Sequence, residues 1–382
     1  TRLFVQNLNN IPKNYYEISE SINLSFFGNI FKLEIPIIRQ SLFAVFSIIF
    51  SLCFLSFAIV MALGGSPKNS TLEVAIFQYA LFDLNFNKAV MLSFIQIIIC
   101  IIFVFIGFYK FKGSNFFEIG PIKYKHPHKN KILIKLIDYF LIVFFSIFLF
   151  SPVILLYSEF LKSIFFKIEL TYTFIHAFIN SIIISLSTGL VVSIFGLLIS
   201  YLLVINHKNF LLQQLLFLTS SMILIISPII FSLGYFIFFQ PIIHYSYLNF
   251  FLVILINVIF LLPFAILIFF NNLKNLYLNF NDFRKTYRIE LINYIKIIFP
   301  LLKNNFLYVF SFSTVITLGD FTIISFFRSE NFETLPSYLF KLISTYQFNE
   351  ASFVAGTILV LSMIIYFFID NLNYQGRPDI TT

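Results

Sequence analysis

The sequence predicts an all-α, polytopic membrane protein with about eight transmembrane helices and an internal two-half repeat. Three observations indicate this class. Hydrophobic residues make up 59% of the 382 residues and charged residues only 11%, a balance far from that of soluble globular domains. The apolar residues gather in eight runs of about 20 residues or more, long enough to cross a hydrocarbon core of about 30 Å. Two charged segments also share one spacing pattern, 265 residues apart.

The eight apolar runs alternate with polar segments. They lie near residues 42–63, 89–109, 136–158, 174–205, 213–239, 249–271, 304–327 and 350–370. Strict alternation places 19 of the 25 Lys and Arg on one side, in residues 1–40, 110–135, 206–212, 272–303 and 371–382. By the positive-inside pattern these segments face the cytoplasm. The segments 64–88, 159–173, 240–248 and 328–349 then face outward.

The charged segments 1–40 and 272–303 each predict an amphipathic helix, because apolar residues recur every three or four positions. These residues are Tyr15, Ile18, Ile22, Phe26, Ile30 and Leu33 in the first segment, and Phe280, Phe283, Tyr287, Leu291, Ile295 and Ile298 in the second. The repeat continues outside the membrane, where Thr71-Leu72 is echoed by Thr334-Leu335 and Phe86-Asn87 by Phe348-Asn349.

The repeat sets the expected domains. We expect the end of a first half over 1–109, a basic cytoplasmic linker over 110–135, a second half over 136–370 and a cytoplasmic tail over 371–382. The second half has four runs ahead of its charged loop and the first half has none. We therefore expect roughly 136 further residues to precede this chain in a longer protein.

Several kinds of chemistry are excluded by missing motifs. The sequence has no GxxxxGK[ST] phosphate loop, no HExxH and no GxSxG, so it predicts no ATP hydrolysis by this chain, no catalytic residues, no metal and no cofactor. The two cysteines lie within apolar runs. His126 and His128 sit in a basic linker without a third ligand, which favours a solvated loop that meets lipid headgroups rather than a metal or a nucleic acid.

The paired amphipathic helices are the informative feature. One such helix could lie among the lipid headgroups, or it could dock into a groove on a partner and transmit motion. Two copies at matching registers favour a partner with two lobes, one for each helix.

The loops resemble the EAA loops of binding-protein-dependent ABC importer permeases, which dock into the two ATPase subunits. Carried onto this sequence, the motif covers Glu17–Asn23 and Asp282–Arg288. The family's Gly is replaced by Asn23 and Arg288, and its Ala pair by Ser19-Glu20 and Arg284-Lys285. The resemblance implies that Glu17, Ser19, Glu20, Asn23, Asp282, Arg284, Lys285 and Arg288 contact the ATPases.

Residues 72–96 and 317–353 are similar to the external segments of the fused, two-half permeases of thiamine importers, and the likeness covers nearly the whole chain. It implies a multi-pass permease subunit of a bacterial inner membrane, moving thiamine or its phosphates from an external binding protein. Iron(III) or polyamine permeases of the same family are the alternative within this class. A secondary transporter or a membrane scaffold without an ATPase is the alternative from another class, and an inert fragment is a third.

Asp320 is the candidate for the substrate path. It lies within the predicted run 304–327, where a carboxylate at the bilayer centre costs about 2.5–3.5 kcal/mol and is seldom kept without a role. Thiamine carries a fixed positive charge, which a carboxylate or an aromatic face would attract. The competing interpretation is a Gly-Asp helix break near the external end, with a structural role only.

Overall fold

The computed structural model describes residues 13–22, 24, 26–64, 70–109, 132–165, 172–206, 209, 211, 212, 214, 222, 225–241, 246–286, 291–329 and 332–374. The chain forms two compact units. One consists of Thr1–Phe54 and Ile97–Leu155, and the other of Leu55–Gln96 and Leu156–Thr382. Apart from an isolated bridge between Ser329 and Phe332, the regular structure of the described residues is helical.

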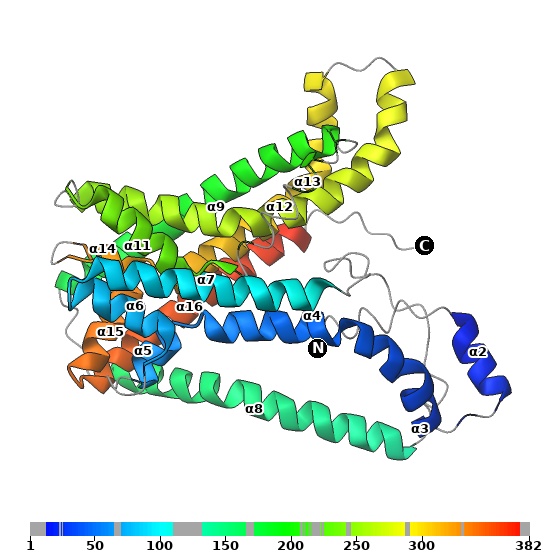
Figure 1. The fold of residues 1–382 in the computed structure, drawn as a ribbon, viewed down its shortest axis with the longest axis horizontal. Coiled ribbons are helices and arrows are strands. Elements are labelled where there is room, and N and C mark those ends of the chain that lie inside the picture. The colour runs from blue at the N-terminus through cyan, green and yellow to red at the C-terminus, as the bar shows by residue number, and fades with distance from the viewer. Residues whose placement is uncertain are drawn as a thin grey trace. The chain divides into compact units, whose positions relative to one another are not determined.

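The described helices follow one another along the chain as Figure 1 shows. They are α2 (Lys13–Ser21), α3 (Phe26–Asn29), the π-helix η1 (Ile30–Glu34), α4 (Ile35–Phe54), α5 (Ala58–Gly64), α6 (Leu72–Leu81), α7 (Phe86–Tyr109), α8 (Ile132–Phe165), α9 (Tyr172–Ile205), α11 (Pro228–Phe239), α12 (Ser246–Thr286), α13 (Leu291–Leu318), α14 (Ile324–Phe327), α15 (Leu335–Ser344) and α16 (Phe348–Tyr374).

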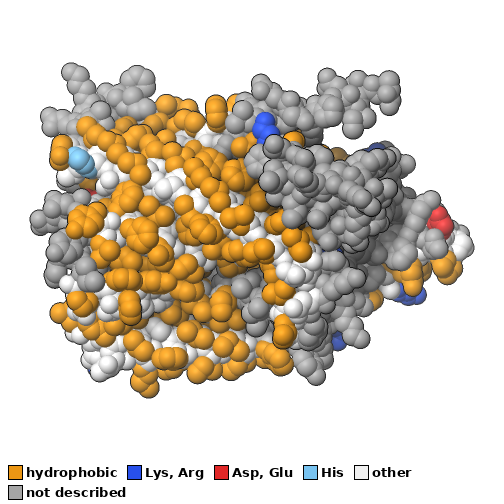
Figure 2. Space-filling view, turned by 90° about the horizontal axis from the view of Figure 1, so that it is seen from above, with side chains coloured by type: hydrophobic (Ala, Val, Ile, Leu, Met, Phe, Trp, Pro, Cys, Tyr) orange, Lys and Arg blue, Asp and Glu red, His pale blue; other side chains and the backbone are white. Residues whose placement is uncertain are grey.

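Five helices of the described residues are long and apolar enough to cross a membrane. They cover Phe86–Gly107, Lys135–Lys162, Tyr172–Ile205, Tyr247–Leu276 and Phe348–Phe368, and they match five of the eight predicted runs. Hydrophobic side chains cover most of the described surface in the view of Figure 2, and charged side chains there are few. Such a surface is suited to lipid rather than to water.

The other three predicted runs are not single helices. The run 42–63 is divided, because α4 ends at Phe54 and α5 begins at Ala58. The run 304–327 is divided in the same way, since α13 ends at Leu318 and α14 begins at Ile324. In the run 213–239, the helix α11 begins only at Pro228, after the N-cap Ser227. The apolar composition continues across each interruption, so hydropathy alone could not locate them.

In the first unit, α4 and the second part of α7 pack closely. The Ser47 hydroxyl donates to the Phe103 carbonyl over 2.8 Å, and the Phe50 and Phe103 rings stack with centroids 3.8 Å apart. Gly107 faces Ser47 without space for a side chain. These contacts join two helices of the first predicted half.

In the second unit, α9 buries a stripe of small residues against α12 and α13. The stripe consists of Ala177, Ser181, Ser185, Thr188, Gly189, Ser193, Gly196 and Ser200. A methyl group added to Gly196 would lie 2.6 Å from Ala265 Cβ on α12, and the Ser200 hydroxyl lies 3.3 Å from the Ile266 carbonyl. Membrane helices pack through small residues because these let backbones approach closely.

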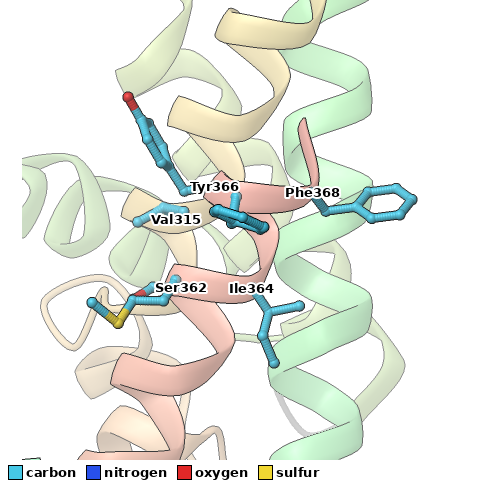
Figure 3. A pocket seen from close by; sticks show the side chains of 7 residues that line it. Val315, Ser362, Ile364, Tyr366 and Phe368 are labelled. Carbon is cyan, nitrogen blue, oxygen red and sulfur yellow. The ribbon is translucent and has the colours of Figure 1, made fainter. Parts of the chain in front are cut away.

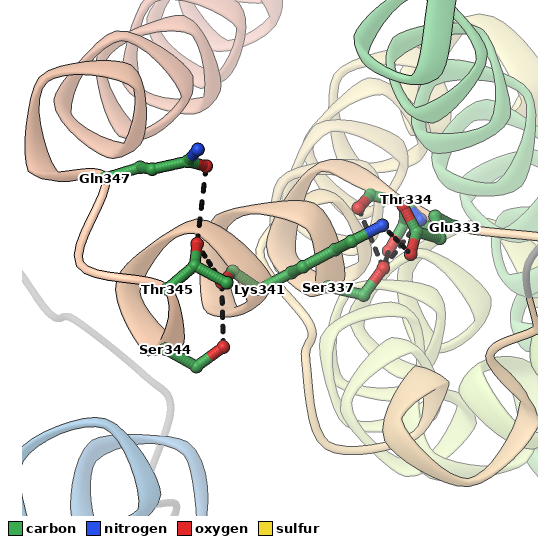
Figure 4. A network of polar contacts seen from close by, with 7 residues as sticks. All are labelled: Glu333, Thr334, Ser337, Lys341, Ser344, Thr345 and Gln347. Atoms are coloured by element: carbon green, nitrogen blue, oxygen red, sulfur yellow. Dashed lines mark hydrogen bonds and ion pairs between the residues drawn. The ribbon is translucent and has the colours of Figure 1, made fainter.

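The N-terminus of α15 is fixed by a polar network (Figure 4). The Thr334 backbone N–H donates to the Ser337 hydroxyl over 2.8 Å, which completes a capping box. The Leu335 N–H donates to the Ser181 hydroxyl of α9 over 2.7 Å. The network satisfies backbone groups that a helix end otherwise leaves unpaired, and it anchors α15 on α9.

The predicted repeat reappears in the helix boundaries. The helices α6 and α15 are both ten residues long, and each follows a threonine N-cap. Of the described residues other than glycine, only Leu84 and Tyr346 have positive φ, at 53° and 61°. Each stands two residues before the phenylalanine that begins the next helix, Phe86 in α7 or Phe348 in α16.

Candidate coupling and substrate-path sites

The first predicted coupling segment begins with the short helix α2. Glu17 is exposed on this helix, while the Ser19 side chain is buried. Glu20 belongs to the same helix, and Asn23 lies outside the described residues. The α2 helix ends at Ser21, and the Leu24 N–H donates to the Ser19 carbonyl over 3.0 Å. The predicted continuous helix is therefore interrupted before α3.

The second predicted coupling segment belongs to two long helices. Asp282, Arg284 and Lys285 lie in the last turns of α12, which extends well beyond the predicted run 249–271. Arg288 lies outside the described residues. The next helix, α13, begins at Leu291 and contains Pro300.

The two segments share their boundaries. The helix before the interruption ends at Ser21 in one and Thr286 in the other, and the helix after it begins at Phe26 and Leu291. Both pairs of boundaries are 265 residues apart, the spacing predicted from the apolar pattern. In each segment, one described helix ends five residues before the next begins, with Glu17 and Asp282 at matching positions.

Asp320 lies in the turn after α13 rather than within a helix. Its carboxyl oxygens accept hydrogen bonds from the Thr322 N–H over 3.0 Å and the Ile323 N–H over 3.2 Å. The Asn257 side chain of α12 is also hydrogen-bonded to this carboxyl. Asp320 therefore stabilises the turn that leads into α14.

Replacing Asp320 with asparagine separates a structural role from a role in transport. Asparagine keeps one acceptor oxygen for the turn but removes the negative charge, so we expect expression within about twofold of the parent chain. If Asp320 attracts a cationic substrate, uptake of labelled thiamine falls by about tenfold or more. Unchanged uptake would remove Asp320 from the substrate path.

Glu73 forms a buried polar site that sequence reasoning missed. It lies in the first turn of α6 and is 0% exposed, as are Gln96 of α7 and Ser227 at the N-cap of α11. The Gln96 amide and the Ser227 side chain are hydrogen-bonded to the Glu73 carboxyl. Glu73 Oε2 and Gln96 Oε1 have no hydrogen-bond partner in the described structure.

This buried site holds an acid near its neutral form. Burial raises the pKa of the Glu73 carboxyl to about 7, against hydrogen bonds from Gln96 and Ser227 that lower it. The repeat gives no matching acid in the second half, where Pro336 and Ile358 occupy the corresponding positions of α15 and α16. The sequence places Glu73 in the predicted external segment 64–88, and only the packing of α6 shows that it is buried.

An apolar groove lies on the second unit between α13 and α16 (Figure 3). It is lined by Val315, Ser362, Met363, Ile364, Tyr366, Phe367 and Phe368. Its polar groups are the hydroxyls of Ser362 and Tyr366, and the lining contains no charged side chain. The groove suits an acyl chain better than a polar solute, and we do not consider it a substrate site.

Several known proteins are similar to this chain over nearly its whole length. The thiamine transport system permease protein of Haemophilus influenzae is 28% identical over 395 aligned positions, which cover 100% of this chain and 71% of that protein. Those of Salmonella typhimurium and Escherichia coli are 26% and 25% identical, and each alignment covers 97% of this chain and 70% of the relative. No protein-family model matches the chain, and no solved structure matches it.

These relatives confirm three of the sequence predictions. The predicted resemblance to thiamine permeases is a homology that extends over both predicted halves. The chain is not an enzyme, because permease subunits of this kind are not catalytic. It is a multi-pass protein of a bacterial membrane, as the five candidate spans also indicate. The chain is a homologue of the thiamine transport system permease proteins of bacteria.

Proposed function

We propose that this chain is the permease subunit of an ATP-driven importer for thiamine or its phosphates. In this proposal about eight spans form parts of two repeated halves, an external binding protein delivers the substrate and ATPase subunits drive transport from the cytoplasm. The observation that carries the proposal is the pair of interrupted helical segments with matching boundaries, at Ser21 and Phe26 and at Thr286 and Leu291. A partner with two equivalent lobes needs two equivalent docking segments.

The proposed route of coupling is mechanical. The second segment connects α12 directly to α13, and both helices pack against α9. A displacement of this segment by an ATPase would therefore move helices that line the core of the second unit. Rigid helices transmit such a movement between two alternating arrangements of the spans.

Charge reversal at the matched acids tests the coupling. We expect the double variant Glu17→Arg and Asp282→Arg to lose co-purification of the ATPase and to lose thiamine uptake by more than tenfold, because like charges at a docking surface cost several kcal/mol. Asp83→Arg is the matched control, since Asp83 is exposed in the predicted external segment. An ATPase that still co-purifies with the double variant would contradict coupling through these segments and favour a secondary transporter or scaffold.

The substrate needs its own measurement. Labelled thiamine should bind to the binding protein encoded beside this chain, and unlabelled thiamine should displace it. Binding of iron(III) or spermidine, with no binding of thiamine, would instead assign the permease to another substrate of the same family.

A further inference from the structure

Two phenylalanines at equivalent positions of the repeat contact each other. Phe57 lies three residues after the last residue of α4, and Phe321 lies three residues after the last residue of α13. Their rings stack with centroids 5.9 Å apart and an interplanar angle of 3°. Both belong to the second compact unit, and they are 2% and 7% exposed.

A second equivalent pair packs against this stack, with the Phe77 ring tilted by 54° to that of Phe57 and the Phe340 ring by 30° to that of Phe321. The Phe77 ring lies 5.0 Å from that of Phe57, and the Phe340 ring lies 4.7 Å from that of Phe321, measured between centroids. Phe77 is the sixth residue of α6, and Phe340 is the sixth residue of α15. The order Phe77, Phe57, Phe321 and Phe340 is therefore symmetric, with two rings from each half. We call these four residues the phenylalanine stack.

In the proposed function, a two-fold rotation relates the equivalent parts of the two halves that belong to the second unit. When a two-fold rotation exchanges two residues, each of them lies at half their separation from the axis. The Phe57 and Phe321 rings are therefore within roughly 3 Å of it. Because both coupling segments are predicted to face the cytoplasm, we expect the repeats to be parallel and their axis to run along the membrane normal. In transporters with such repeats, the substrate path lies at the interface of the halves.

We infer that the phenylalanine stack is the external gate of the transport path, and that its ring faces are the surface that a flat organic cation meets when the gate opens. The inference rests on the proposed function. The residues that follow α4 and α13 supply the two central rings, Phe57 and Phe321. The short helices α6 and α15, on the predicted external side, supply the rings of Phe77 and Phe340 that pack against them. Apolar constrictions close a path by excluding water, and aromatic faces attract organic cations.

The position of Glu73 agrees with this assignment. Glu73 lies four residues before Phe77 in α6, so the two side chains share a face of that helix. Glu73 therefore places a buried carboxyl group, hydrogen-bonded to Gln96, one turn from the outer ring of the stack. The phenylalanine rings carry no formal charge, so they attract a cation only weakly and do not retain it.

Reversible cross-linking of the central pair tests the gate. In a chain carrying Cys53→Ser and Cys100→Ala, the variant Phe57→Cys and Phe321→Cys is treated with a short bifunctional methanethiosulfonate. We expect thiamine uptake to fall by more than tenfold and to recover when the cross-link is reduced. The control is Phe50→Cys and Phe103→Cys, a pair stacked at 3.8 Å within one half. This pair should cross-link without loss of uptake.

Uptake that continues through the cross-linked central pair would overturn the gate. A milder variant, Phe57→Leu and Phe321→Leu, keeps an apolar closure but removes the ring faces. It should raise the KM for thiamine by about tenfold. An unchanged KM would overturn the ring contact with the substrate.

A readout without substrate separates this inference from the proposed function. The single variant Phe321→Cys in the same background should react faster with a membrane-impermeant maleimide when vanadate traps the ATPase than at rest. If thiamine is not transported but this reactivity rises, the proposed substrate is wrong and the gate stands. If thiamine is transported and the reactivity stays constant, the gate is wrong and the proposed function stands.

Discussion

Replacing Gly196 with leucine is expected to cause a large loss of stability in the second unit. The first added carbon would lie 2.6 Å from Ala265 Cβ, and leucine adds three more carbons behind it. Inserting carbons into a packed interface costs about 1–3 kcal/mol, and more where the backbones must separate. The midpoint of thermal unfolding in detergent should fall by about 5–10 °C, measured by loss of monodisperse protein after heating.

The control for this prediction is Leu198→Phe on the same helix. Leu198 is half exposed, so a larger side chain there meets lipid or detergent instead of α12. We expect its unfolding midpoint to stay within about 2 °C of the parent. Equal midpoints for Gly196→Leu and the parent would show that α9 and α12 do not approach as closely as described.

The second large effect is expected at Glu73. Its pKa is raised by burial from 4.5 to about 7, so the folded state holds a proton that the unfolded chain releases between these values. Stability from this group is therefore present below pH 4.5, falls as the pH rises from 4.5 to 7, and stays low above pH 7. The pKa difference between the unfolded and folded chain corresponds to about 3 kcal/mol of unfolding free energy.

The variant Glu73→Gln removes this dependence on pH. Glutamine still accepts the hydrogen bond from the Gln96 amide, but it never ionises. We expect the variant to unfold at a higher temperature than the parent at pH 8, and the difference to shrink toward zero near pH 4.5. A difference that does not change between pH 4.5 and pH 8 would show that Glu73 titrates like an exposed acid.

The sequence predicted the long helices and the repeat, because both produce long patterns. Five of the eight apolar runs correspond to helices that could cross a membrane. The 265-residue spacing of the loops reappears in Ser21 and Thr286 and in Phe26 and Leu291. These features depend on many residues each, so no single residue had to be interpreted correctly.

The breaks in the helices could not be predicted in this way. Leu55-Ser56-Phe57 and the residues after Asp320 are as apolar as the helices before them, so hydropathy continues where the helices end. The phenylalanine stack was missed for a related reason. The chain contains 57 phenylalanines, and only the positions of α6 and α15 relative to the two breaks show which four of them meet.

The candidate site was predicted only in part. The coupling residues follow from a local pattern, and they remain proposals. Glu73 was missed because its burial depends on Gln96 and Ser227, which lie 23 and 154 residues further along the chain. Asp320 was predicted within the run 304–327, with a Gly-Asp helix break as the competing interpretation, and α13 does end at Leu318. Contacts between distant segments, rather than any local signal, determine both environments.

The π-helix η1 has a consequence for the history of the chain. The stretch from Phe26 to Phe54 contains 29 residues, of which five form η1, whereas its counterpart α13 contains 28. A π-helical turn accommodates one residue more than an α-helical turn. After an ancestral gene duplication, a codon gained or lost in one copy would thus be absorbed inside the helix as a bulge. The positions after the bulge then keep the register of the repeat, with Phe57 and Phe321 each three residues beyond the helix end.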